Sequence, residues 1–142
     1  MTTEEYLKQI DRLDRMIQNK LSEIYQLKTM VCSVTVSKDG DKVKTSPDQD
    51  RLGSAVAKIV DLERETDRLV DKFIEKRQRI IEQIEGLENL DYYDVLTMKY
   101  VGKNSISEIA DKMGYTSRNV FMIRNKALAE FEKKYGNEYK NL

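Results

Sequence analysis

The chain has 142 residues, enough for one globular domain or for a small domain joined to an elongated element. Charged residues make up 35% of it, and one proline and six glycines are few, a composition that favours long surface-rich helices over a compact β fold. The 25 basic and 25 acidic residues exclude a histone-like polycation, while one cysteine and no histidine exclude an internal disulfide, zinc-finger chemistry and His-based catalysis.

The opening residues, MTTEEYLKQ, are acidic and polar, unlike the start of a secretory signal. No apolar run approaches the length of a membrane span. We therefore expect a cytoplasmic protein that has no membrane partner.

The first predicted helix begins at a capping box, because Thr2 and Glu5 have the spacing at which a hydroxyl and a carboxylate satisfy the first free amides. Apolar residues then recur at steps of three and four, as they do along one side of a helix. They are Tyr6, Leu7, Ile10, Leu13, Ile17, Leu21, Ile24, Leu27 and Val31.

Residues 32–46 interrupt this pattern and predict a connection between helices. Val34 and Val36 alternate with polar residues, and Asp39-Gly40 is a favoured tight-turn pair, so a small β-hairpin is one interpretation. A flexible loop is the other, since isolated hairpins are only marginally stable.

The second predicted helix starts with Ser46 as N-cap, Pro47 in the first helical position and Gln49 completing a capping box. Its apolar positions have helical spacing, with Thr66 as a polar interruption and Gly86 as a weak point near the end. They are Leu52, Val56, Ile59, Leu62, Leu69, Phe73, Ile80, Ile84 and Leu87.

Two long amphipathic helices joined by a short connection predict an antiparallel hairpin over residues 1–89. Such a pair buries one narrow seam, yet Met16, Tyr25 and Met30 lie beside the apolar side of the first helix. This surplus apolar surface predicts a further partner, most simply a second copy that completes a four-helix bundle. We therefore expect a homodimer formed through the hairpin.

Residues 90–142 predict a small three-helix domain. DYYDVLTMKYV forms the first helix, Ser105 and Glu108 make a capping box for the second, and Gly114 ends that helix in the left-handed conformation. Thr116 then caps a third helix over residues 117–135. The fold class is thus all-α: a long coiled-coil-like antiparallel hairpin followed by a helix-turn-helix domain.

A short helix, a turn containing glycine and a longer basic helix form a helix-turn-helix, which offers the second helix to the major groove of DNA. From Tyr115 to Tyr135 the sequence has five basic and two acidic residues. Arg118 can read guanine, Asn119 can contact adenine or phosphate, and Arg124 and Lys126 suit the phosphate backbone. The expected outward residues are Ser117, Arg118, Asn119, Phe121, Met122, Arg124, Asn125 and Lys126.

The run YDVLTMKYVGKNSISEIADKMGYTSRNVFMIRNKALAEF resembles region 4 of sigma-70 family factors, chiefly in VLTMKY, SEIADKMGYTSRNV and NKALAEF. The resemblance implies base contacts by Ser117, Arg118 and Met122. Phe121 and Met122 replace polar residues common in that family, so its base preference does not transfer. The chain also has no counterpart of the DNA-melting sigma region 2, which argues against a free-standing sigma factor.

Over nearly its full length, the chain is similar to small phage- or prophage-encoded proteins that join a helical half to a sigma-region-4-like end. YLKQID, DRLGSAVAKIVDLE and NKALAEF carry this similarity. It extends to the RinA and ArpU groups, regarded as regulators of late phage transcription, and to relatives of unknown function. The resemblance implies a transcriptional regulator acting on DNA in a bacterial host cell.

Three function classes follow from these patterns. The first is a dimeric regulator that binds double-stranded DNA, the second an accessory protein of RNA polymerase, and the third a DNA-packaging component like a terminase small subunit. No constellation of catalytic groups points to an enzyme. We also expect no cofactor and no metal, because Asp39, Asp41, Asp48 and Asp50 lack the glycine and terminal glutamate positions of a calcium-binding EF-hand loop.

Overall fold

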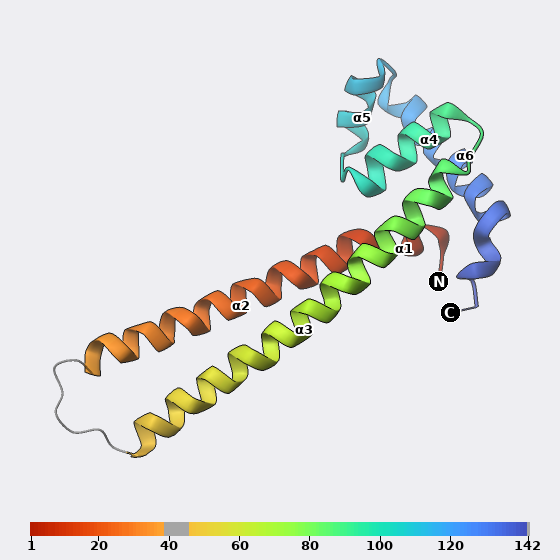
Figure 1. Cartoon of the computed structure of the whole chain (residues 1–142). Coiled ribbons are helices and arrows are strands. Elements are labelled where there is room, and N and C mark those ends of the chain that lie inside the picture. Colours follow the sequence, from red (N-terminus) through yellow and green to blue (C-terminus); the bar gives the residue numbers. More distant parts are fainter. Residues whose placement is uncertain (39–45, 142) are drawn as a thin grey trace. The chain divides into compact units, whose positions relative to one another are not determined.

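The structure, a computed structural model, describes residues 1–38 and 46–141, with the backbone alone for residues 34–38 and 46–49 (Figure 1). Every regular element of these residues is helical, so the predicted all-α class is confirmed. The elements are α1 (Thr3–Leu7), α2 (Gln9–Lys38), α3 (Ser46–Glu85), α4 (Leu90–Leu96), the π-helical turn η1 (Thr97–Val101), α5 (Ile106–Met113), α6 (Ser117–Tyr135) and the 3-10 turn η2 (Gly136–Glu138).

The contacts divide the chain into two compact units. The hairpin unit is Asp14–Lys72, and the terminal unit combines Met1–Leu13 with Phe73–Leu142. This grouping differs from the boundary expected between residues 89 and 90. The reason is a shared core, in which buried side chains of α1, the start of α2 and the end of α3 pack with those of α4, η1, α6 and the C-terminal end. The buried members are Tyr6, Leu7, Ile10, Ile80, Ile84, Leu87, Leu96, Tyr100, Ala127, Phe131 and Tyr139.

The hairpin unit is a pair of antiparallel helices, α2 and the first part of α3. Ile24, Ile59 and Leu62 form its buried seam, with Leu27 and Val31 packed against them. Ion pairs join the helices, with Nζ–carboxylate distances of 3.0 Å for Lys20–Glu65 and 3.2 Å for Lys28–Glu63. Thr66, the predicted polar interruption, is buried, and its hydroxyl donates to the carbonyl of Leu62 at 2.7 Å.

Two expectations for the long helices need correction. The first helix is interrupted at Lys8, although the capping box of Thr2 and Glu5 is present as predicted. α2 continues through Cys32 and Val36 to Lys38, so residues 32–38 are neither loop nor strand. The expected Asp39-Gly40 turn lies outside the described residues, as do the side chains of the predicted Ser46–Gln49 cap.

The two apolar stripes are only partly covered in the hairpin unit. Leu21 and Val56 belong to these stripes, and both are 46% exposed. Helical spacing identifies the apolar side of a helix but not how much of it a single partner helix covers. The hairpin unit therefore buries one narrow seam, as expected of a helix pair, and leaves part of each stripe exposed.

In the terminal unit, Asn89 is the N-cap of α4, and its side chain accepts from the amide of Tyr92 at 3.2 Å. The predicted three-turn helix over DYYDVLTMKYV is present, but its last turn is wound as the π-helix η1. The amide of Gly102 donates to the carbonyl of Thr97 at 2.9 Å and closes this wider turn. Lys103 then adopts a left-handed φ of 58°, which redirects the chain into α5.

Candidate nucleic-acid interface

The turn between α5 and α6 has the geometry that its residues predict. The capping box of Ser105 and Glu108 starts α5, and Gly114 ends it with a φ of 71°. Glycine has no Cβ to strain in this left-handed conformation, which is why it favours the position. The hydroxyl of Thr116 accepts from the amide of Asn119 at 3.1 Å and starts α6. Three residues thus separate the two helices.

A small apolar core holds α5 and α6 together with α4. Val95, Ile109, Ala110 and Val120 are buried, and four partly buried side chains pack against them: Met98, Ile106, Met113 and Ile123. Ala110, whose small side chain allows the helices to approach closely, is only 5% exposed. This core fixes which side of α6 points inward.

The opposite side of α6 is exposed over its first half. Arg118, Met122 and Asn125 are spaced by four and three residues, so they share the side facing away from buried Val120 and Ala127. Phe121 and Met122 are each about half exposed. Of the eight residues expected to point outward, seven do: Ser117, Arg118, Asn119, Phe121, Met122, Asn125 and Lys126.

Arg124 is the exception, because its side chain does not point freely outward. Its side chain is 18% exposed, and Nη1 lies 3.6 Å from Oε1 of Glu4 on α1. The guanidinium also lies over the ring of Phe121, 5.0 Å from the centroid, and Nη2 donates to the side chain of Asn125 at 3.3 Å. Arg124 therefore joins α1 to α6 and is not a free outward cation.

Tyr100, on η1, lies beside this ion pair and is 4% exposed. Its hydroxyl and Nε of Arg124 are buried without a hydrogen-bond partner among the described residues. Burial, with a smaller effect from the Glu4 carboxylate, raises the pKa of Tyr100 to about 12, since its anion would be poorly solvated there. Tyr100 is thus neutral at physiological pH.

Tyr115 links the turn between α5 and α6 to α4. Its hydroxyl lies 3.2 Å and 3.3 Å from the two carboxylate oxygens of Asp91 on α4. The hydrogen bond to this carboxylate raises the pKa of Tyr115. Sequence reasoning missed this contact, because nothing in the spacing of residues 91 and 115 indicates it.

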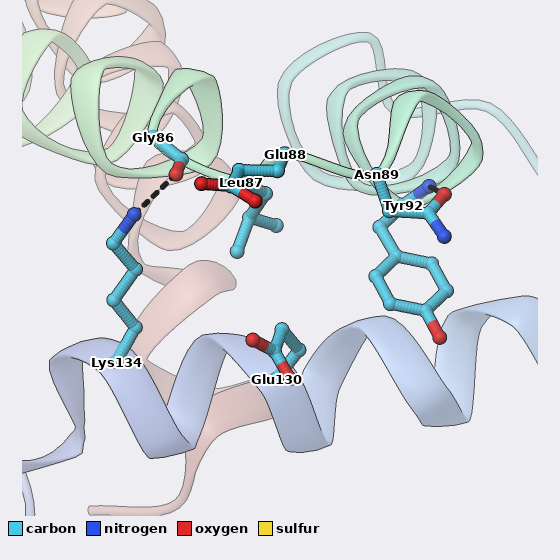
Figure 2. Close-up of a pocket in the computed structure, with 7 residues that line it drawn as sticks. All are labelled: Gly86, Leu87, Glu88, Asn89, Tyr92, Glu130 and Lys134. Atoms are coloured by element: carbon cyan, nitrogen blue, oxygen red, sulfur yellow. Dashed lines mark hydrogen bonds between the residues drawn. The ribbon is translucent and has the colours of Figure 1, made fainter.

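A cavity of about 400 Å³ lies beside α6 (Figure 2), and neither Arg118 nor Met122 is among its lining residues. It is lined by Gly86, Leu87, Glu88, Asn89, Tyr92, Glu130 and Lys134. The ammonium of Lys134 donates to the carbonyl of Gly86, just beyond the end of α3. Carbonyls at the C-terminal end of a helix lack partners within the helix, so Lys134 satisfies one that α3 leaves free. Because its ammonium is used in this bond, Lys134 contributes less to an exposed basic surface.

Among residues 1–38 and 46–141, no group of three His, Cys, Asp or Glu side chains is arranged to hold a metal ion. In the same part of the chain, no helix combines the length and apolar character that crossing a membrane requires.

Comparison with known proteins identifies one family. Residues 33–132 match the family described as "Protein of unknown function (DUF1492)". The matched segment begins within α2 and ends within α6, so it includes α3, α4 and α5 in full. No curated protein and no solved structure gives a significant match. Because the match spans well over half of its 142 residues, the chain belongs to the DUF1492 family.

Proposed function

We propose that this protein binds double-stranded DNA through residues 117–126 of α6 and acts as a transcriptional regulator of the phage or prophage type. The observation that carries the proposal is the exposed side of α6, which is supported by α5 across a three-residue turn. This half of α6 exposes Arg118 and Lys126 and contains no acidic residue. A helix exposed in this way can enter a major groove.

The chemistry of each exposed side chain suits it to one kind of contact with DNA. Arg118, near the start of α6, can donate two parallel hydrogen bonds to guanine, and Asn125 can pair with adenine. Met122 lies between them on the same side and offers an apolar contact for a thymine methyl group. Lys126 is suited to a backbone phosphate, which fixes position without reading sequence.

The proposal places the protein on DNA in the cytoplasm of a bacterial cell. Selection of fragments from bacterial and phage genomes with the purified chain, followed by fluorescence anisotropy, tests it. We expect a preferred fragment whose binding weakens as salt concentration rises, since phosphate contacts release counterions. The absence of binding to any fragment at low salt contradicts the proposal.

Arg118→Ala is the diagnostic variant, and Lys133→Ala, an exposed cation farther along α6, is its control. If Arg118 reads a base, its loss costs about 1–3 kcal/mol on the preferred fragment and much less on unrelated DNA. The control should change both affinities by a similar, smaller amount. Equal weakening of Arg118→Ala on every sequence contradicts base reading. Recovery of the chain with RNA polymerase in the absence of DNA would instead favour the accessory-protein hypothesis.

A further inference from the structure

One side of the hairpin unit is hollowed into a groove between its two helices. The groove has a volume of about 390 Å³ and is lined by Leu21, Ile24 and Lys28 of α2 and by Glu63, Thr66 and Asp67 of α3. Ile24 and Thr66 are its buried lining residues, and the side chains of Lys28 and Glu63 are exposed. A groove of this kind fits a further helix.

Exposed apolar residues extend the groove along both helices. Tyr25 lies one turn beyond Leu21 on α2, and it is 73% exposed. On α3, Val56 and Val60 are 46% and 41% exposed, and their spacing from Glu63 puts them on the same side. We call this surface the groove face: Leu21, Tyr25, Lys28, Val56, Val60, Glu63 and Asp67.

The core of the hairpin unit is too small to account for these residues. Among the described side chains of the unit, the buried apolar ones are Ile17, Ile24, Ile59 and Leu62, and they form a single row between the helices. Small helical units rarely gain enough stability from so little buried surface, and contiguous exposed apolar patches usually mark interaction sites.

We propose that the groove face binds the groove face of a second copy, so that two hairpin units form a four-helix bundle. The charges favour this occupant. Lys28 on the α2 edge is paired with Glu63 on the α3 edge of the same copy, at 3.2 Å, and the α3 edge carries a second carboxylate, Asp67. With a two-fold axis parallel to the helices, α2 of each copy lies over α3 of the other, so each Lys28 also approaches the acidic edge of the partner copy.

The proposal does not depend on DNA binding, and it refines the dimer expected from composition. Of the residues that predicted surplus apolar surface, Tyr25 belongs to the groove face and Met30 does not. Met30 follows Leu21 by nine residues, about two and a half turns at 3.6 residues per turn, and therefore projects from the opposite side of α2. It is nevertheless 61% exposed, which makes it a matched control.

Light scattering of the full chain over a dilution series, without DNA, tests the interface. We expect the mass of a dimer that dissociates on dilution. Leu21→Glu and Val60→Glu should each raise the dimer Kd at least tenfold, because each puts a carboxylate into the apolar contact. Met30→Glu should leave the Kd within a factor of two or three.

Circular dichroism of every variant shows whether the helices are retained. Should a glutamate variant lose helicity, Tyr25→Ser replaces it, since Tyr25 is too exposed to support the fold of a single hairpin. A monomer at every concentration overturns the proposal. A Kd that rises equally with Met30→Glu also overturns it, as does a ring of many copies.

Discussion

The rings of Tyr6 and Tyr139 stack with their centroids 4.3 Å apart and their planes 10° from parallel. The stack joins α1 to the C-terminal end of the chain. The Tyr139 hydroxyl also bonds the hydroxyl of Thr3 at 2.7 Å, and the Tyr6 hydroxyl donates to Gln83 of α3 at 2.6 Å. Gln83 in turn donates to Glu138 at 2.7 Å. The two ends of the chain are therefore parts of the unit that carries α6.

Replacing Tyr139 tests this connection. Tyr139 is fully buried, so Tyr139→Ala should lower the free energy of unfolding by about 3–5 kcal/mol, as large-to-small changes of buried aromatic residues do. Tyr139→Phe keeps the stack and loses the hydrogen bond to Thr3, so it should cost only about 1 kcal/mol. Urea unfolding at one fixed protein concentration measures both. Equal effects of the two variants would show that the stack contributes little.

Gly86→Ala and Gly53→Ala are a matched pair of substitutions, because only the first would bring a Cβ against another residue. A Cβ at Gly86 would lie 2.0 Å from the hydroxyl oxygen of Tyr135, whereas a Cβ at Gly53 has nothing within 4 Å. Gly86→Ala should therefore destabilise the protein by about 1–3 kcal/mol through steric overlap. Gly53→Ala, within α3, should stabilise it by about 0.5–1 kcal/mol, because alanine favours the helix.

Urea unfolding measures both glycine variants, and a double variant identifies the cause at Gly86. Tyr135→Phe removes the hydroxyl that the new methyl group would strike, so it should recover part of the loss. If it recovers nothing, Gly86 is required for another reason, such as the backbone conformation after α3.

Tyr100 should make stability fall at alkaline pH. Its pKa is raised to about 12 in the folded chain and is near 10 when unfolded, so the folded state retains the proton between these values. The stabilisation is fully present below pH 10 and is lost as pH rises toward 12, with a size of roughly 2–3 kcal/mol.

Tyr100→Phe tests this, because phenylalanine cannot ionise. The variant should be at least as stable as the original chain at pH 8, since the removed hydroxyl is buried without a hydrogen bond. Between pH 10 and 12 it should lose less stability than the original chain. Tyr6 and Tyr139 also have raised pKa values, so part of the alkaline loss will remain. Identical pH profiles would exclude Tyr100 as a cause.

Features that depend on neighbouring residues could be predicted from the sequence. The caps at Thr2, Ser105 and Thr116 follow from a side chain that bonds an amide three residues ahead, and the left-handed Gly114 follows from the absence of a Cβ. The exposed side of α6 follows from the three- and four-residue spacing of its apolar residues. These interactions are complete within about two helical turns, so their signal is local.

Features that join distant segments could not be predicted. Glu4 pairs with Arg124, and Tyr6 stacks on Tyr139, although the partners are more than a hundred residues apart in the sequence. The periodicity of apolar residues shows which side of a helix is buried, but not which other segment packs against it. The alternation of Val34 and Val36 suggested a strand, but the helix continues past them to Lys38. β-branched residues disfavour a helix by only a few tenths of a kcal/mol, which context overrides.

Arg124 and Lys126 should have different effects on DNA binding, although both are cations in the same half of α6. Lys126 is exposed, so if it contacts a phosphate, Lys126→Ala should reduce the slope of log affinity against log salt by about 1. Arg124 is already paired with Glu4 and packed on Phe121, so Arg124→Ala should leave that slope nearly unchanged. Its loss should instead lower the free energy of unfolding by roughly 1–2 kcal/mol through lost packing. Anisotropy titrations at several salt concentrations, with urea unfolding of the same samples, separate the two effects. An equal reduction of the slope by both variants would mean that the guanidinium leaves Glu4 when DNA binds, because a cation that stays paired has no counterion to release.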